Sequence, residues 1–173
     1  MLSQKRRNRI LLCVAIILGG IFLDQLTKLL AVKYLMPKGS VCLISGVVNL
    51  TYVENPGAAF GMLKDHRWVF MVISTVAIVA MGVYLFAKKL EKNPLADIAL
   101  SMIIGGGIGN MLDRLYLGYV VDFIDVSPLF SFAVFNGADS FVCVGAGLLV
   151  LATLLEFKNE TKAQKEKTDE ASL

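Results

Sequence analysis

Four long apolar runs alternate with polar segments along the chain and predict transmembrane helices. They lie at about residues 10–35, 68–87, 95–117 and 136–157. At about 1.5 Å per helical residue, each is long enough to cross the roughly 30 Å hydrocarbon core of a bilayer. The second run contains no charged residue and has Trp68 and Tyr84 near its ends, as is typical of a helix anchored at both membrane interfaces.

Short strand-like runs interrupt this helical pattern. Residues 41–44 and 47–53 are separated by Ser45-Gly46, which predicts a hairpin, and residues 120–124 form another such run. The segment 54–61, with its proline and glycines, predicts a turn. The expected fold is therefore an all-α polytopic membrane protein with four transmembrane helices and a small extracytoplasmic β-sheet.

The charge pattern predicts the orientation of the helices in the membrane. Lys and Arg residues gather at the N-terminus, in a short turn at 88–92 and after residue 157. The positive-inside rule puts these segments in the cytoplasm, so both termini are expected there, and it leaves 36–67 and 118–135 on the outer side. We interpret residues 1–157 as one membrane-embedded domain of the cell membrane and 158–173 as a polar, disordered tail.

Composition narrows the possible functions. The chain is 56% hydrophobic and its mean hydropathy is +0.67, which is too apolar for an ordinary soluble domain. The net charge of +3 does not indicate nucleic-acid binding, because the basic residues flank apolar runs. Three dispersed cysteines and a single histidine provide neither a zinc-ligand pattern nor a Ser-His-Asp triad. We expect no metal and no cofactor.

Acidic residues within or beside the apolar runs are the candidates for function. An ionised carboxylate in lipid costs roughly 3 kcal/mol or more, so Asp113, Asp122 and Asp139 need a reason to be there. Asn110 and Asn136 each precede an acid by three residues and would share a helix face with it. Helical rise puts Asp24, Asp113 and Asp139 at similar depths, about 21–27 Å above the inner edge. We therefore expect a polar site near the outer boundary of the bilayer.

Two carboxylates held together at low dielectric do not easily both ionise, so one keeps a proton while the other acts as a base. This asymmetry suits hydrolysis of a peptide bond without a metal. The residues alone do not decide which two of these acids form the pair. Asp113 adjoins Arg114 and could form a structural ion pair, whereas Asp122 and Asp139 have no adjacent cation. Asp24 and Lys28, four residues apart, are either a helix-stabilising ion pair or part of the site.

Five motifs occur in order along residues 20–150, and together they resemble the lipoprotein signal peptidases, the type II signal peptidases of bacteria. They are Asp24-Gln25-Leu26-Thr27-Lys28, Asn55-Pro56-Gly57-Ala58-Ala59-Phe60, Gly106-Gly107-Ile108-Gly109-Asn110-Met111-Leu112-Asp113-Arg114, Val120-Val121-Asp122-Phe123 and Phe135-Asn136-Gly137-Ala138-Asp139-Ser140.

The resemblance implies an intramembrane aspartic endopeptidase with Asp122 and Asp139 as its catalytic dyad. Its substrate would be a diacylglyceryl-modified prolipoprotein, cut just before the lipidated cysteine, and globomycin would inhibit it. The outer hairpin would be the family's β-cradle, resting on membrane lipids. The other site residues carried over from the motifs, which would order the site or contact substrate, are Asp24, Lys28, Asn55, Gly57, Asn110, Asp113, Arg114, Asn136 and Ala138. Of these, Asp113 would be structural and bonded near Arg114.

Two other functional classes also fit a small polytopic protein with buried acids. A proton-coupled transporter would use the acids as a relay, but transporters typically contain internal repeats and a site at the midplane. A non-catalytic assembly factor would use the outer loops as a binding surface.

Overall fold

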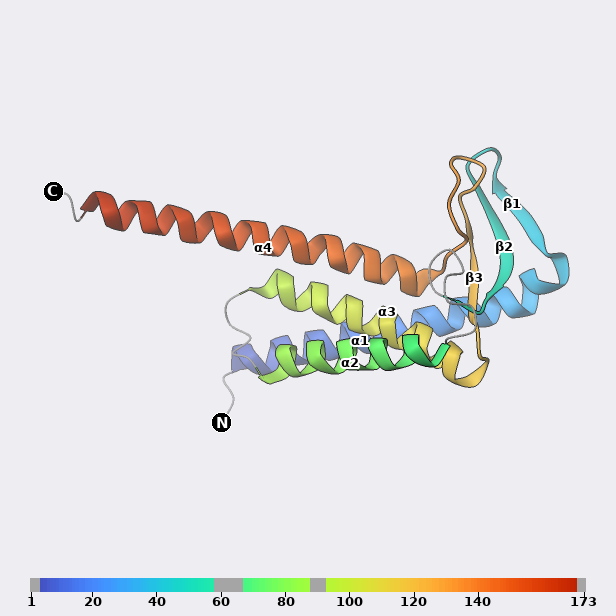
Figure 1. Ribbon diagram of the computed structural model, residues 1–173, viewed down its shortest axis with the longest axis horizontal. Coiled ribbons are helices and arrows are strands. Elements are labelled where there is room, and N and C mark those ends of the chain that lie inside the picture. The colour runs from blue at the N-terminus through green and yellow to red at the C-terminus, as the bar shows by residue number, and fades with distance from the viewer. Residues whose placement is uncertain (1–3, 58–66, 88–92, 171–173) are drawn as a thin grey trace.

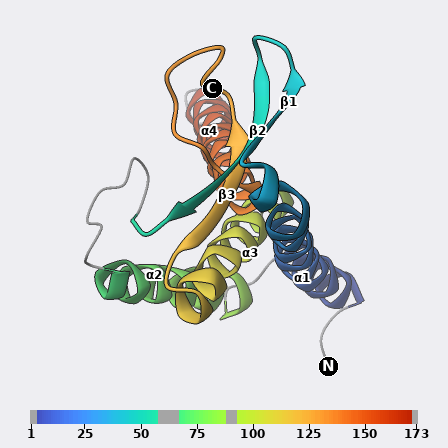
Figure 2. The same ribbon diagram turned by 90° about the vertical axis from the view of Figure 1, so that its right-hand side faces the viewer.

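The computed structural model describes residues 4–57, 67–87 and 93–170 (Figure 1). Within these residues, long helices run along a common direction and an antiparallel sheet lies across one end of them (Figure 2). The helices are α1 (Gln4–Leu30), α2 (Arg67–Ala87), α3 (Pro94–Tyr116) and α4 (Gly137–Glu170), and the strands are β1 (Ser40–Ile44), β2 (Val48–Asn55) and β3 (Val120–Asp125). The predicted fold class, mostly helical with a small sheet, is confirmed.

In the part of the chain that the structure describes, three helical segments are long and apolar enough to cross a membrane: Gln4–Lys38, Pro94–Tyr116 and Gly137–Gln164. Within α2, Met71–Phe86 is a shorter apolar helix, so its role as a fourth span stays a prediction. Large apolar side chains cover the outside of the bundle, and Val76 of α2, for example, is 64% exposed. Such a surface is suited to lipid rather than water, and the chain is a multi-pass membrane protein.

Helix α3 is the central helix, because it packs against α1, α2 and α4. Its glycines permit this packing, as the sequence indicated. A Cβ at Gly105 would lie 3.1 Å from the carbonyl oxygen of Ile17 in α1, and one at Gly106 would lie 2.5 Å from that of Ala138 in α4. The helices therefore approach one another at backbone distance on two sides of α3.

The sheet continues directly from the end of α1. The helical path passes through a π-turn (Ala31–Leu35) and a 3-10 turn (Met36–Lys38), and Gly39, at a φ of 72°, starts the change of direction into β1. Strand β2 is central and pairs antiparallel with β1 and β3. The β1–β2 turn contains Gly46 at a φ of 73°, where the hairpin was predicted. The first residues of β3 are buried.

The structure differs from the sequence-based expectation at the C-terminus. Helix α4 continues to Glu170 and extends beyond the other helices, whereas a disordered tail was expected from residue 158 (Figure 1). This segment is rich in Lys, Glu, Gln and Ala, which are strong helix formers, and propagating an existing helix needs no new nucleation. The turn predicted at 54–61 is partly described: Glu54 and Asn55 are the end of β2, and residues 58–61 lie outside the described residues. The predicted turn at 88–92 also lies outside them.

The close packing of α3 and α4 predicts unequal effects at two glycines of α4. A Cβ at Gly145 would lie 2.9 Å from the carbonyl oxygen of Ala99, whereas one at Gly147 would meet nothing within 4 Å. Gly145→Ala should lower the free energy of unfolding by about 1–3 kcal/mol, and Gly147→Ala should be neutral or raise it by up to about 1 kcal/mol. Thermal unfolding in detergent measures both variants. Equal melting temperatures would contradict the contact.

Candidate active site

Asn136 and Asp139 form a reciprocal cap at the start of α4. The Asn136 side-chain Oδ1 accepts a hydrogen bond from the Asp139 backbone N–H at 3.0 Å, and Asp139 Oδ2 accepts one from the Asn136 backbone N–H at 3.1 Å. This is the capping-box arrangement, in which two otherwise unsatisfied N–H groups are paired. The Asn-x-x-Asp spacing therefore fixes Asp139 in the first turn of α4.

The Asn136 amide also joins α4 to β3 and α3. Asn136 is completely buried, and its Nδ2 donates to Asp122 Oδ1 at 2.7 Å and to Asn110 Oδ1 at 3.0 Å. The other oxygen of Asp122 accepts a hydrogen bond from Asn55 Nδ2 of β2 at 2.9 Å. Asp122, only 2% exposed, is thus held from two sides.

Asn110 of α3 connects this group to a buried cation. Its Nδ2 donates to Asp139 Oδ1 at 2.8 Å, and its Oδ1 accepts from Lys28 Nζ, also at 2.8 Å. Lys28 in turn lies 2.8 Å from Asp24 Oδ2 and 3.0 Å from Asp113 Oδ2. All three charged side chains are at least 96% buried. A continuous network of charges and amides therefore links α1, α3, α4 and β3.

Asp24, Lys28 and Asp113 form what we call the ion cluster. Each of its two carboxylates also holds another element in place. Asp24 Oδ1 accepts from the Ala138 backbone N–H at 3.1 Å, and Asp113 Oδ2 accepts from the Val121 backbone N–H at 3.0 Å. The cluster thus fixes the starts of both α4 and β3. Gly109 of α3 leaves the room that Asp24 occupies, because a Cβ there would overlap the Asp24 carboxylate.

The expected bond of Asp113 near Arg114 is wrong, because the ion pair of Asp113 is with Lys28. Adjacent residues on a helix point in different directions and do not face each other. Arg114 instead donates to the carbonyl oxygen of Gly57 at 3.0 Å and to that of Asn110 at 3.3 Å. It thereby ties the end of β2 to α3.

A cavity of about 500 Å³ opens beside these groups. Asp122 and Asp139 both line it, together with Asn55, Asn110 and Arg114. The remaining lining residues are Val120, Phe132, Ala133, Val134, Phe135, Ser140, Val142, Cys143 and Val144. Five of the other site residues carried over from the motifs do not line the cavity, and they bind the residues and elements that do; they are Asp24, Lys28, Asp113, Asn136 and Ala138. The described residues contain no group of three or more His, Cys, Asp or Glu side chains that could hold a metal ion.

Two parts of this arrangement were not predicted from the sequence. Gln25 donates to Asp113 Oδ1 at 3.0 Å and to Asp24 Oδ2 at 3.2 Å, so it belongs to the same network. Its place beside Asp24 in the first motif was the available signal. The aromatic residues Phe132 and Phe135 also line the cavity. Phe135 begins the fifth motif, whereas Phe132 lies in an irregular segment outside the motifs and had no such signal.

The Asp122 carboxyl group is a weaker acid than usual. Burial raises its pKa to about 6, and the negative charge of Asp139 also raises the pKa, whereas the hydrogen bonds from Asn55 and Asn136 lower it. By contrast, hydrogen bonds from Ser127 lower the pKa of Asp125, three residues along the same strand. The cavity therefore contains a carboxyl group that can hold or release a proton near neutral pH, as acid–base chemistry requires.

Comparison with known proteins identifies the family. Residues 5–155 match the family described as Signal peptidase (SPase) II. The chain is 50% identical over 149 residues to the lipoprotein signal peptidase of Caldanaerobacter subterraneus subsp. tengcongensis, covering 85% of this chain and 97% of that one. It is 44% identical over 139 residues to that of Brevibacillus brevis, covering 80% and 91%.

A solved structure agrees with this match. It is described as a bacterial membrane enzyme determined by the in meso method at 2.3 Å, and it superposes with a TM-score of 0.77 at 34% identity. The match covers 85% of this chain and 90% of that one. The chain therefore belongs to the signal peptidase II family, the lipoprotein signal peptidases, which are proteases that cleave signal peptides from prolipoproteins.

Proposed function

We propose that this protein is an aspartic endopeptidase whose catalytic dyad is Asp122 and Asp139. The observation that carries the proposal is that both carboxylates line one cavity and are bound to the same buried residue, Asn136. Its side-chain amide donates to Asp122 and its backbone N–H donates to Asp139. The substrate is a diacylglyceryl-modified prolipoprotein, and the cut falls just before its lipidated cysteine. Nothing in the comparisons supports the transporter alternative.

The two acids divide the work of hydrolysis. Asp122, whose pKa burial raises to about 6, keeps the proton, and Asp139 is the base. Asp139 takes a proton from water as the water oxygen attacks the scissile carbonyl carbon, while Asp122 gives its proton to the carbonyl oxygen. The tetrahedral intermediate then collapses, the C–N bond breaks, and the leaving amine receives a proton from the dyad. The amides of Asn110 and Asn136 hold both carboxylates in position.

The walls of the cavity suit an extended apolar peptide. Its apolar lining includes Phe132, Val134, Phe135 and Val142, which match the apolar residues of a signal peptide. Arg114 contributes a positive charge to the same cavity and donates a hydrogen bond to the carbonyl oxygen of Gly57. Globomycin-type inhibitors would occupy this space in place of the substrate.

The membrane arrangement proposed here has four spans, with α2 as the second. The basic N-terminus and the Lys-containing end of α4 lie in the cytoplasm. The sheet and the cavity are then at the outer face. A lipid-modified substrate anchored in the outer leaflet would present its scissile bond at this level, which supports the assignment of substrate and site together.

Removing either proposed catalytic carboxylate tests the dyad. Asp122→Asn and Asp139→Asn keep the size of the side chain and remove the acid–base function, so each should lower the cleavage rate of a diacylglyceryl-modified prolipoprotein roughly 100-fold or more. Asp125→Asn is the matched control, because Asp125 lies on β3 with Asp122 but outside the cavity. Its rate should remain near that of the wild type. Normal cleavage by folded Asp122→Asn or Asp139→Asn would refute the dyad.

The pH dependence of kcat/KM tests the proton held by Asp122. Since the reaction needs Asp122 protonated, kcat/KM should fall as pH rises past about 6. Asn55 donates to Asp122 Oδ2 and favours the charged form. Asn55→Ala should therefore raise the pKa of Asp122 and move the basic limb of the pH profile, where kcat/KM falls, to higher pH by about one unit.

Asn49→Ala is the control for this measurement. Asn49 lies on β2 like Asn55, but it hydrogen-bonds with Asp125 rather than Asp122. The limb should stay in place in this variant. A limb that moves downward in Asn55→Ala, or equally in both variants, would contradict the role of Asp122 as the acid.

A further inference from the structure

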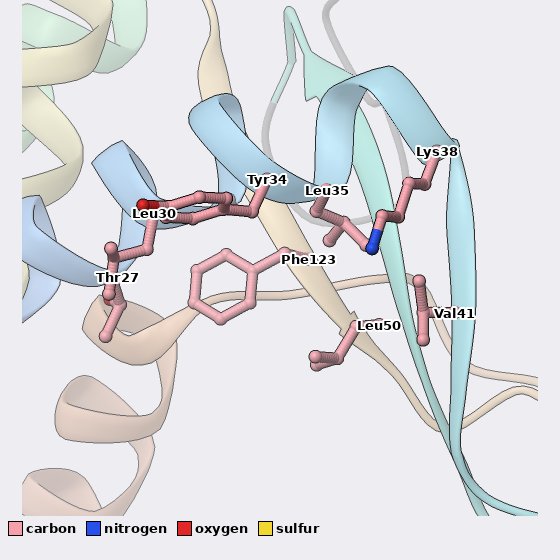
Figure 3. A pocket seen from close by; sticks show the side chains of 9 residues that line it. Thr27, Leu30, Tyr34, Leu35, Lys38, Val41, Leu50 and Phe123 are labelled. Atoms are coloured by element: carbon pink, nitrogen blue, oxygen red, sulfur yellow. The ribbon is translucent and has the colours of Figure 1, made fainter.

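A second cavity lies on the opposite face of β3 from the carboxylates. Successive side chains of a strand point to opposite faces, so that Asp122 lines the cavity described above and Phe123 lines a separate one of about 390 Å³. We call this second cavity the rear groove. Leu30, Tyr34 and Leu35 at the end of α1 form one wall, and Val41, Leu50 and Phe123 of the sheet form the other (Figure 3). The two cavities share no lining residue.

Lys38 gives this apolar groove a single positive charge. It is the one charged residue that lines the groove, and Figure 3 shows its side chain running from the 3-10 turn toward the apolar side chains. Among the described residues, no carboxylate forms an ion pair with Lys38. The groove thus combines a long apolar surface with a cation that has no ion-pair partner in the described chain.

The position of the groove along α1 matches the headgroup layer of a bilayer. The apolar part of α1 begins at Ile10, after Arg9, and about 20 residues span the hydrocarbon core, so the core ends near Leu30. The turns that follow, to Lys38, therefore lie at the level of the lipid phosphates. Tyr34, 58% exposed, is the kind of aromatic residue found at this boundary.

We propose that the rear groove binds one acyl chain of an anionic membrane phospholipid, with the lipid phosphate at Lys38. The volume is within the range of small-molecule sites, about 300–1,000 Å³. A lysine at this depth attracts anionic headgroups, and the apolar walls take the chain. This choice of occupant rests on the proposed function: with the scissile bond at Asp122 and Asp139, the acyl chains of the substrate would lie on the other face of β3. The occupant assigned to the rear groove is therefore a lipid of the bilayer.

Lipid binding by the full-length protein tests the proposal. Delipidated protein in detergent is titrated with phosphatidylglycerol, and the bound lipid is counted by native mass spectrometry. Lys38→Glu should weaken retention of the first lipid about tenfold. Lys33→Glu makes the same charge change five residues earlier, at a side chain that lies over the Tyr34 ring and does not line the groove. It should change retention less than twofold.

A second pair of variants tests the shape of the groove without changing charge. Val41→Trp fills the groove from an exposed position of β1 and should remove the first bound lipid, whereas Leu43→Trp, on the same strand and outside the groove, should not. Thermal unfolding confirms that each variant is folded.

Three outcomes would overturn the proposal. Equal weakening by Lys33→Glu and Lys38→Glu would mean that diffuse surface charge holds the lipid. Unchanged binding in folded Val41→Trp would place the lipid elsewhere. Displacement of the lipid by a diacylglyceryl-modified peptide would assign the binding site to the substrate.

Discussion

The ammonium of Lys28, buried between Asp24 and Asp113, is the interaction on which the rest of the site depends. Burying these charges is costly, and the mutual pairing and the further hydrogen bonds offset that cost. Because the partners come from α1 and α3, and because they bind the backbone at Ala138 and Val121, this one cation fixes four elements at once. Removing one member of such a group typically costs about 3–5 kcal/mol, since the others keep uncompensated charge.

The ion cluster also sets the direction of the two amides. Lys28 can only donate, so Asn110 presents its oxygen to Lys28 and its NH2 group to Asp139. Asn136, whose NH2 group donates to that same oxygen, also donates to Asp122. The orientation of the two amides between Lys28 and the proposed dyad therefore follows from one charge.

Local pattern was enough to predict most of the fold, whereas the list of candidate site residues came from the motifs that carry the family resemblance. Neither predicted which of these residues bind one another. The apolar runs located the helices, and Ser45-Gly46 located the hairpin turn. The depth estimate brought Asp24, Asp113 and Asp139 together because helical rise is nearly constant. The partner of Asp113 could not be derived in this way. It depends on how α1 rotates against α3, which is a tertiary property. The helical end of α4 was missed because composition alone does not separate a charged helix from a disordered tail.

The missing side chain at Gly109 has a consequence for how this sequence can vary. The space beside the α3 backbone that a methyl group would fill is occupied by the Asp24 carboxylate of another helix. Positions 24 and 109 therefore share one volume, and a gain at one requires a loss at the other. Substitution at Gly109 is open only to a chain that has already given up the acid on α1, and with it one of the two counterions of Lys28. The lack of a Cβ at Gly109 therefore restricts which sequences fit this site as strongly as the charge of Asp24 does.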